Sequence, residues 1–267
     1  MSATLRKTRT LLAVWFAHMS AYRAEIVIWM LTGAVPLIML AIWIGKARVS
    51  GGSVQGFMAP DFAAYFLGAW ITQQWIVAWV SWEISNQIRT GTLSPRLLRP
   101  LDPMWDHAAG HLTERLVRLP FIVVIVGVGL LLVPGTRLTP DAWHALAFVL
   151  CINLAFAIRF LIAYCTGLLA FWFDQATAID ELYYVIAAFL TGSFAPLAFY
   201  PPLARAAIEW TPFPYLVYYP VRVLTGAADG LEIVRVLGVQ LVWLCLCVLL
   251  RGVLWRRGLQ RYGAVGA

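Results

Sequence analysis

The sequence predicts an all-α integral membrane protein with six transmembrane helices. Residues 26–45 contain no charged side chain, and comparable apolar stretches recur about five more times among the 267 residues. A helix rises about 1.5 Å per residue and needs roughly 20 apolar residues to cross a hydrocarbon core of about 30 Å. Of the residues, 61% are hydrophobic and only 12% are charged. Six spans with their connections use nearly the whole length, so we expect one transmembrane domain over residues 1–267 and no separate soluble catalytic domain.

The formal net charge of +7 does not indicate a nucleic-acid partner, because the Lys and Arg residues fall between apolar runs instead of clustering in one stretch. The four cysteines lie inside apolar runs, and two of them are separated by a single residue, which points their side chains to different sides of a helix. We therefore expect small buried hydrophobic side chains, with neither a disulfide nor a metal site. These cysteines are Cys151, Cys165, Cys245 and Cys247.

The apolar runs place the spans in order along the chain. Residues 1–23 carry four Lys and Arg side chains around the run Leu11–Met19, which is too short to cross a membrane. We expect this segment to form an interfacial helix lying on the inner leaflet. A Gly and Ser-rich loop, residues 46–61, is expected to follow the first span. The spans are expected near residues 26–45, 62–82, 116–134, within 142–173, 182–199 and 233–254.

The distribution of Lys and Arg orients these spans. With both termini inside, the inner segments contain 12 Lys and Arg residues and the outer segments contain 5. The positive-inside rule therefore predicts that both termini are cytoplasmic. The loop at residues 173–181 gives no support, because its charged side chains are all acidic. Acidic side chains weigh little in that rule, so the predicted orientation stands.

The most polar part of the chain is residues 83–118, between the second and third spans, on the predicted cytoplasmic side. Asp102 followed by Pro103 is a good helix start, since it provides an N-cap acceptor with proline at the first helical position. We expect an amphipathic helix that leads into span three with its polar face in solvent. The apolar face would be Met104, Ala108, Leu112 and Leu116, and the polar face Asp106, His107, His111, Glu114, Arg115 and Arg118.

Two stretches carry a resemblance to a known family. The string EISNQIRTGTL at residues 83–93, continuing to Leu-Leu-Arg-Pro at 97–100, resembles the acidic, Gly-Thr-Leu and Arg-Pro pattern after the second span of ATP-binding-cassette (ABC) type-2 transport system permeases. The proline-rich stretch at residues 196–226 is similar to that family's outer loop with short re-entrant helices. The six-span layout also matches the family. From this resemblance we expect residues 200–230 to form an extracytoplasmic re-entrant region.

The resemblance implies a permease, the transmembrane subunit of an ABC exporter in the inner membrane of a prokaryote. It implies as partners a cytoplasmic ABC ATPase dimer and a second permease subunit, identical or homologous. The chain has no G-x-x-x-x-G-K-[ST] phosphate loop, so we expect ATP and Mg²⁺ on the ATPase, and no cofactor or catalytic residue in this chain. Relatives of this kind are associated with drugs, organic cations, lipids and polysaccharides, and the sequence does not choose among them.

The resemblance also implies that residues 83–118 couple the chain to the ATPase. A polar loop with a short helix can dock in a cleft of a cytoplasmic ATPase and transmit its closure to spans two and three. Charged side chains offer pairs for that contact, and Gly91 permits a tight turn. The competing interpretation is a solvated loop whose arginines fix the topology or touch anionic lipid. The candidate coupling residues are Glu83, Arg89, Gly91, Thr92, Arg96 and Arg99.

His107 and His111 are four residues apart and share a predicted helix face with Glu114. That spacing can bind zinc, but the string HAAGH lacks the adjacent glutamate of a metalloprotease helix. A cytoplasmic polar face produces such pairs by chance. We therefore favour a solvated face over a metal site.

Three side chains within the predicted spans are candidates for a translocation path. Arg159 lies near the middle of span four, where an arginine costs about 2.5–3.5 kcal/mol and needs a protein partner or a wet cavity. Asn153, or a group on a neighbouring span, could be that partner, and the role of the pair could be structural or functional. Gln73 and Gln74 in span two lie among four tryptophans, which could stack on a flat or cationic substrate or could serve packing alone.

Two other classes of function compete with the permease. A secondary transporter or channel-like protein would work without an ATPase, but such proteins commonly carry inverted repeats and membrane-embedded acidic side chains, and neither is recognisable here. An intramembrane enzyme would need a nucleophile with a base, or a cluster of metal ligands, within the spans. We find no such set in the sequence.

Overall fold

The computed structural model describes residues 3–21, 28–30, 33–173 and 176–262. Most of these residues are helical, and a short two-stranded hairpin is the sheet found among them. The α-helices are α1 (Ala3–Ala21), α3 (Val35–Val49), α4 (Ala59–Ile76), α5 (Val80–Arg89), α6 (Ser94–Leu97), α7 (Pro103–Leu132), α8 (Ala142–Leu168), α9 (Ala176–Leu190), α10 (Pro202–Glu209), α11 (Tyr218–Leu224) and α12 (Gly230–Arg261). The remaining elements are β1 (Ser53–Val54), β2 (Phe57–Met58) and the 3₁₀ turns η1 (Leu169–Phe171), η2 (Leu197–Phe199) and η3 (Phe213–Tyr215).

Four helices among the described residues are long and apolar enough to cross a membrane: Ile28–Val49, Pro103–Leu132, Ala142–Phe171 and Gly230–Arg261. They correspond to the predicted first, third, fourth and sixth spans. The helices at the predicted second and fifth spans are shorter, with 18 residues in α4 and 15 in α9. The all-α membrane architecture is therefore confirmed, and the count of six spans stays a prediction.

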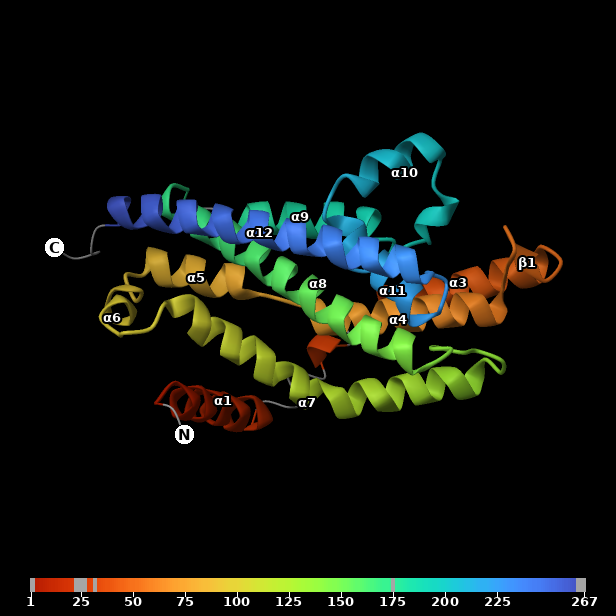
Figure 1. Cartoon of the computed structure of the whole chain (residues 1–267), viewed down its shortest axis with the longest axis horizontal. Coiled ribbons are helices and arrows are strands. Elements are labelled where there is room, and N and C mark those ends of the chain that lie inside the picture. Colours follow the sequence, from red (N-terminus) through yellow and green to blue (C-terminus); the bar gives the residue numbers. More distant parts are fainter. Residues whose placement is uncertain (1–2, 22–27, 31–32, 174–175, 263–267) are drawn as a thin grey trace.

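The molecule is an elongated bundle whose long helices run along its length (Figure 1). Helix α8 lies in the middle and packs against α4, α5, α11 and α12. Helix α1 lies beside α7, and α1 and the C-terminal end of α12 are at the same end of the bundle as α6. The β1–β2 hairpin and α11 are toward the opposite end.

The predicted span at 62–82 is not one continuous helix. Helix α4 ends at Ile76, Val77 adopts an extended backbone with φ −54° and ψ 132°, and α5 begins at Val80. Ala78 in the break is fully buried, whereas Trp79 is 39% exposed, and the hydroxyl of Tyr184 donates to the carbonyl of Ala78 at 3.2 Å. This bond satisfies a backbone acceptor that the broken helix leaves open. Sequence hydropathy does not register such a break, because Trp, Val and Ala continue the apolar run through it.

Other predicted boundaries also shift. The polar helix and span three are the single helix α7, which continues through Pro120. The predicted span at 182–199 is wrong at its C-terminal end, since α9 stops at Leu190 and Gly192 takes a left-handed conformation with φ +86°. The Gly and Ser-rich loop folds into the β1–β2 hairpin, whose turn residues Gln55 and Gly56 both have positive φ.

Helix α5 packs closely against α8 at Gly167. Gly167 is buried on α8, and a Cβ at this position would lie 2.7 Å from the carbonyl oxygen of Ser81. The hydroxyl of Ser85 donates to the carbonyl of Gly167 at 3.2 Å. The absence of a side chain thus lets α5 approach α8 directly, which fixes the segment that follows α5.

Candidate functional site

The predicted coupling segment, residues 83–118, consists of most of α5, a turn, α6 and the first half of α7. Gly91 terminates α5 in the left-handed region with φ +73°, as the sequence predicts for a tight turn. The amide of Leu93 then donates back to the carbonyl of Gln87 at 3.1 Å, and the Leu93 side chain is fully buried. The turn is therefore a fixed structure that presents α6 at one end of the bundle (Figure 1).

Asp102 ties the end of this segment to the last helix. Its carboxylate caps α7 by accepting from the amide of Met104 at 2.9 Å, which confirms the predicted helix start. The same carboxylate accepts two charge-assisted bonds from Arg251 of α12, at 2.5 and 2.6 Å. This ion pair therefore couples the position of the α6–α7 connection to that of α12.

Asp106, one turn further along α7, holds the segment from two sides. It forms an ion pair with Arg96 of α6 at 2.7 Å and accepts from the indole of Trp15 of α1 at 3.1 Å. Trp15 also packs on Gly110, where a Cβ would lie 3.3 Å from the indole ring. The candidate Arg96 is thus paired within the chain, and α1 is fastened to the outside of α7.

The remaining candidates differ in exposure. Arg89, Thr92 and Arg99 are on the surface, and the hydroxyls of Thr92 and Thr90 are 3.0 Å apart. Glu83 is only partly exposed, and its carboxylate lies 3.7 Å from Nε2 of His111. The structure therefore assembles an exposed group around the turn and a second, inward-facing position at Glu83.

The polar face of α7 is not in solvent, which makes the solvated-face prediction wrong. His107, His111, Glu114, Arg115 and Arg118 are buried, whereas Leu112 and Leu116 on the opposite face are 44% and 52% exposed. The polar side chains face the neighbouring helices of the bundle, where Glu114 contacts Trp79 and Arg118 contacts Gln74 of α4. In the part of the chain that the structure describes, no three His, Cys, Asp or Glu side chains are grouped so that they could bind a metal ion.

Glu114 is the centre of this buried network. It accepts from the indole of Trp79, in the α4–α5 break, at 3.0 Å, and it is ion-paired with Arg118 one turn along α7. Nδ1 of His111 lies 3.7 Å from the same carboxylate. His111 thereby joins Glu114 to Glu83, and burial raises the pKa of the Glu83 carboxyl while His111 opposes that rise.

Arg118 extends the network to α4. Its Nη1 donates to Oε1 of Gln74 at 2.9 Å, and the Gln74 amide nitrogen donates to the backbone carbonyl of Met30 at 3.2 Å. Gln74 therefore serves as a bridge between helices. The network spans both sides of the α4–α5 break, so the two halves of the predicted second span are joined through α7.

Arg115 is a buried cation that sequence reasoning noted only as part of the polar face. Its guanidinium lies over the rings of Phe156 of α8 and Trp75 of α4. None of its three nitrogens has a hydrogen-bond partner among the described residues. The sequence shows Arg115 next to Glu114 on the polar face of the helix. No sequence signal identifies its aromatic partners, because they come from other helices.

Arg159 on α8 has partners from a neighbouring helix, as predicted, but Asn153 is not one of them. Its guanidinium lies over the rings of Tyr183 and Tyr184 of α9, and Nη2 is 3.8 Å from the carboxylate of Asp180. Asn153 instead donates to the carbonyl of Val149 on its own helix at 2.7 Å. Arg159 thus fastens α9 to α8.

Gln73 and the adjacent Gln74 make contacts with different parts of the bundle. The amide nitrogen of Gln73 donates to the hydroxyl of Ser193, in the turn after α9, whereas Gln74 joins the α7 network. The predicted translocation residues Gln73, Gln74 and Arg159 therefore belong to three different contacts. The contacts of Gln74 and Arg159 each connect two helices, whereas that of Gln73 connects α4 to the turn after α9, and the role of all three in transport stays a prediction.

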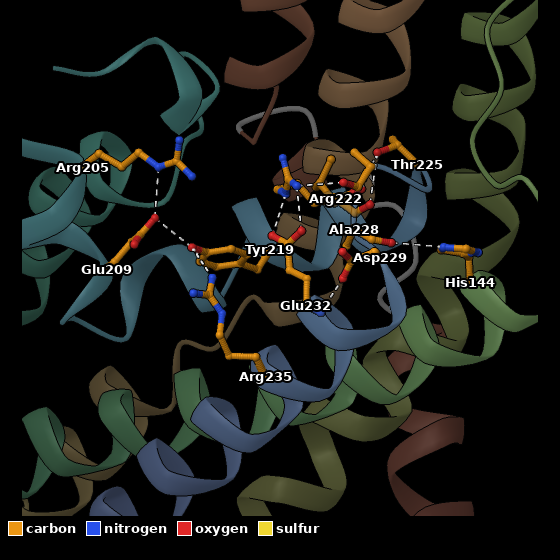
Figure 2. A network of polar contacts seen from close by, with 12 residues as sticks. His144, Arg205, Glu209, Tyr219, Arg222, Thr225, Ala228, Asp229, Glu232 and Arg235 are labelled. Atoms are coloured by element: carbon orange, nitrogen blue, oxygen red, sulfur yellow. Dashed lines mark hydrogen bonds and ion pairs between the residues drawn. The ribbon is translucent and has the colours of Figure 1, made fainter. Parts of the chain in front are cut away.

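The region at 200–230 contains the short elements α10, η3 and α11, held by the polar network in Figure 2. Arg222 makes a two-pronged ion pair with Glu232 of α12, at 2.9 and 2.7 Å. Asp229 caps α12 by accepting from the amide of Glu232 at 2.7 Å. His144 of α8 lies 3.3 Å from the carbonyl of Ala228. This network anchors the connection between α11 and α12 to α8.

A second part of Figure 2 converges on Tyr219. Its hydroxyl donates to Glu209 of α10 at 2.9 Å and accepts from Arg235 of α12 at 3.2 Å. Glu209 is also ion-paired with Arg205 at 3.0 Å, and this bond raises the pKa of the Arg205 guanidinium. Arg205 and Arg222, two of the five Lys and Arg residues in the predicted outer segments, are therefore both paired with carboxylates of this region.

The contacts of this segment connect several helices of the bundle. The turn at Gly91 and helix α6 are exposed, and the carboxylates of Asp102, Asp106 and Glu114 connect the segment behind them to α12, α1 and α4. A force on the turn would reach the whole bundle through these contacts. The buried arginines supply positive charge inside the bundle.

The profile of the ABC-2 family transporter proteins matches residues 35–266. This range is most of the chain, and the chain belongs to that family. No curated protein and no solved structure matches it.

Proposed function

We propose that this ABC-2 family chain is the permease subunit of an ATP-driven exporter in the cytoplasmic membrane of a prokaryote. ATP would be hydrolysed by a separate cytoplasmic ATPase dimer, and the substrate would pass between this chain and a second, identical or homologous permease. The observation that carries the proposal is the family match over residues 35–266. The sequence contains no phosphate loop of its own, which supports the division of labour.

The geometry of residues 83–118 supports the coupling role. Arg89, Thr92 and Arg99 lie on the surface around the turn at Gly91, while the ion pairs of Arg96 and Asp102 stiffen the segment behind it. A rigid, exposed element held by ion pairs can transmit a displacement to the helices behind it, whereas a flexible loop would deform instead. ATPase closure would act first on α6 and then on α7 and α12.

Six membrane spans fit this proposal. In Figure 1, α4 followed by α5, and also α9, run along the bundle beside the four longer apolar helices. The Lys and Arg asymmetry favours an inner location for α1, α6 and the end of α12, which lie at one end of the bundle. The region at 200–230 would then be outside.

The competing function is a secondary transporter or channel-like protein that needs no ATPase. The network of Glu83, His111 and Glu114 provides titratable groups for such a mechanism. The His111 ring lies between the two carboxylates, with one ring nitrogen 3.7 Å from Glu83 and the other 3.7 Å from Glu114. Proton relays use such chains. The family match favours the ATP-driven mechanism, so this alternative stands second.

Purification of the full-length tagged chain from its native membranes tests the proposal. We expect a stable complex that hydrolyses Mg-ATP, with an ATPase subunit that carries a phosphate loop. A chain carrying the substitution of Gly91 by valine, purified in parallel, should show reduced hydrolysis or lose the ATPase. Transport activity in membranes from which no ATPase copurifies, driven by an ion gradient alone, would favour the alternative.

A further inference from the structure

A groove lies between the last turns of α12 and the segment that follows α8. It has a volume of about 500 Å³, and its walls include Leu169, Trp172, Val253 and Leu254. Its rim carries Arg257 and Arg261. The coupling contacts described above involve none of these side chains.

Gly258 of α12 is the point at which the two segments that line the groove come closest. It is buried on α12, and a Cβ there would collide with the ring of Phe171, with one ring carbon 2.6 Å away. Because there is no side chain, η1 lies directly against α12 and brings Trp172 alongside the basic turns. The groove is therefore built by the close approach of two chain segments.

The two arginines of the rim are one helical turn apart, so their side chains emerge on the same face of α12. Within the described residues, neither forms an ion pair, whereas Arg96, Arg118, Arg205, Arg222 and Arg251 all have carboxylate partners. The groove thus offers two positive charges that are available to an anion. Arginine is well suited to phosphate, which it can bind with two parallel hydrogen bonds.

The walls indicate what kind of anion fits. Leucine and valine line the groove beside the arginines, and a small soluble phosphate compound would leave this apolar surface unused. Helix α12 has 32 residues and is about 48 Å long at about 1.5 Å per residue, so it extends beyond a hydrocarbon core of about 30 Å. Its basic last turns would reach the headgroup layer, where tryptophan is also enriched.

We propose that this groove binds an anionic phospholipid, with the phosphate between Arg257 and Arg261 and an acyl chain along Leu169, Val253 and Leu254. The bound lipid fixes the end of α12 against η1. This inference rests on the membrane location of the chain and is independent of the ATPase coupling proposed above.

The test uses the full-length protein in neutral detergent. Its unfolding temperature is followed during titration with dioctanoyl phosphatidylglycerol, dioctanoyl phosphatidylcholine or glycerol 3-phosphate. A ligand that binds only the folded protein raises this temperature as its concentration passes the dissociation constant. We expect phosphatidylglycerol to act at the lowest concentration, and glycerol 3-phosphate to act weakly because it has no acyl chain.

Three variants locate the effect. Replacement of both Arg257 and Arg261 by alanine should raise the phosphatidylglycerol concentration needed by about tenfold or more, as expected for losing two charge-assisted contacts. Arg256→Ala is the control for unspecific charge, because it removes one positive charge from the same part of α12 but does not line the groove. Val253→Trp keeps both arginines and fills the groove, so it should also weaken the response to the lipid.

The proposal is overturned if the double alanine variant or Val253→Trp responds to phosphatidylglycerol as the unaltered protein does. An equal loss in Arg256→Ala would overturn it too, because only diffuse charge would then be involved. An equal response to glycerol 3-phosphate would show a soluble phosphate ligand. If the double variant keeps its lipid response and instead loses a copurifying ATPase, the groove is a protein contact.

Discussion

Glu83 is a carboxylate kept in a place that disfavours its charge. It stands just beyond the predicted end of span two and is partly buried, and its carboxylate lies 3.7 Å from Nε2 of His111. Burial raises its pKa, and the neighbouring Glu114 adds to the rise while His111 and Arg96 oppose it. An ionisable group held against its own solvation is typical of a functional position, because packing alone would favour a neutral side chain.

Glu83→Gln tests that reasoning through the pH dependence of stability. The pKa of Glu83 is higher in the folded than in the unfolded protein, so its ionisation destabilises the fold above the folded pKa. We expect the variant to unfold at a higher temperature than the unaltered protein near pH 7.5. The difference should disappear as the pH falls below the usual glutamate pKa, where the carboxyl is neutral in both states. Thermal unfolding in detergent across this range measures it.

The exposed carboxylate Glu181 provides the control, since Glu181→Gln should change the unfolding temperature little at any of these pH values. If Glu83→Gln is less stable than the unaltered protein at pH 7.5, the ionised carboxylate stabilises the fold. The argument for a functional role then fails.

At the scale of the element, α7 shows what the sequence could and could not predict. The Asp102 cap, the proline at the first position and the two-faced helix were all readable, because capping and helical periodicity are local properties. The direction in which the polar face points was not, since it depends on which helices pack against α7. Glu114 and Arg118 therefore turn inward, where the periodicity alone suggested solvent.

Helix α5 is fixed by its contact with α8, and Gly167 is the residue that permits it. Gly167→Ala would place a Cβ 2.7 Å from the carbonyl oxygen of Ser81, so one helix must move. We expect a loss of about 1–3 kcal/mol in unfolding free energy, the usual range for overpacking. Thermal or denaturant unfolding in detergent, compared with the unaltered protein, measures this loss.

Gly127→Ala on α7 is the matched control, because a Cβ there has no atom within 4 Å. Alanine is preferred to glycine in a helix by roughly 1 kcal/mol, so this variant should be neutral or slightly more stable. Equal stability of the two variants would show that the approach of α5 to α8 has no special importance.

At the scale of the whole molecule, hydropathy predicted the apolar helices and missed the interruptions between them. In the break at residues 77–79, the carbonyl of the buried Ala78 is satisfied by Tyr184, which is 106 residues away in sequence. Such a contact leaves no local pattern. The same holds for Arg159, whose need for a partner was predictable from the energetics of a buried charge, while the identity of Tyr183, Tyr184 and Asp180 was not.

The predicted orientation can be measured with single cysteines in a variant that lacks the four native ones. Leu98, at the end of α6, is 87% exposed, and Ala227, before α12, is also exposed. An impermeant thiol reagent applied to intact cells should label Ala227→Cys and leave Leu98→Cys unlabelled until the membrane is opened. Labelling of Leu98→Cys alone in intact cells would invert the topology.

The central claim, that a separate ATPase docks on the turn and α6, is tested most directly by site-specific photo-crosslinking in native membranes. A photoreactive amino acid at Leu98 should yield an adduct with a protein that contains a phosphate loop. The same group at Val123, which is 68% exposed on the apolar face of α7, should yield none because it would face lipid. Equal adducts from both positions, or no ATPase adduct from position 98 while the chain still supports transport, would contradict the account.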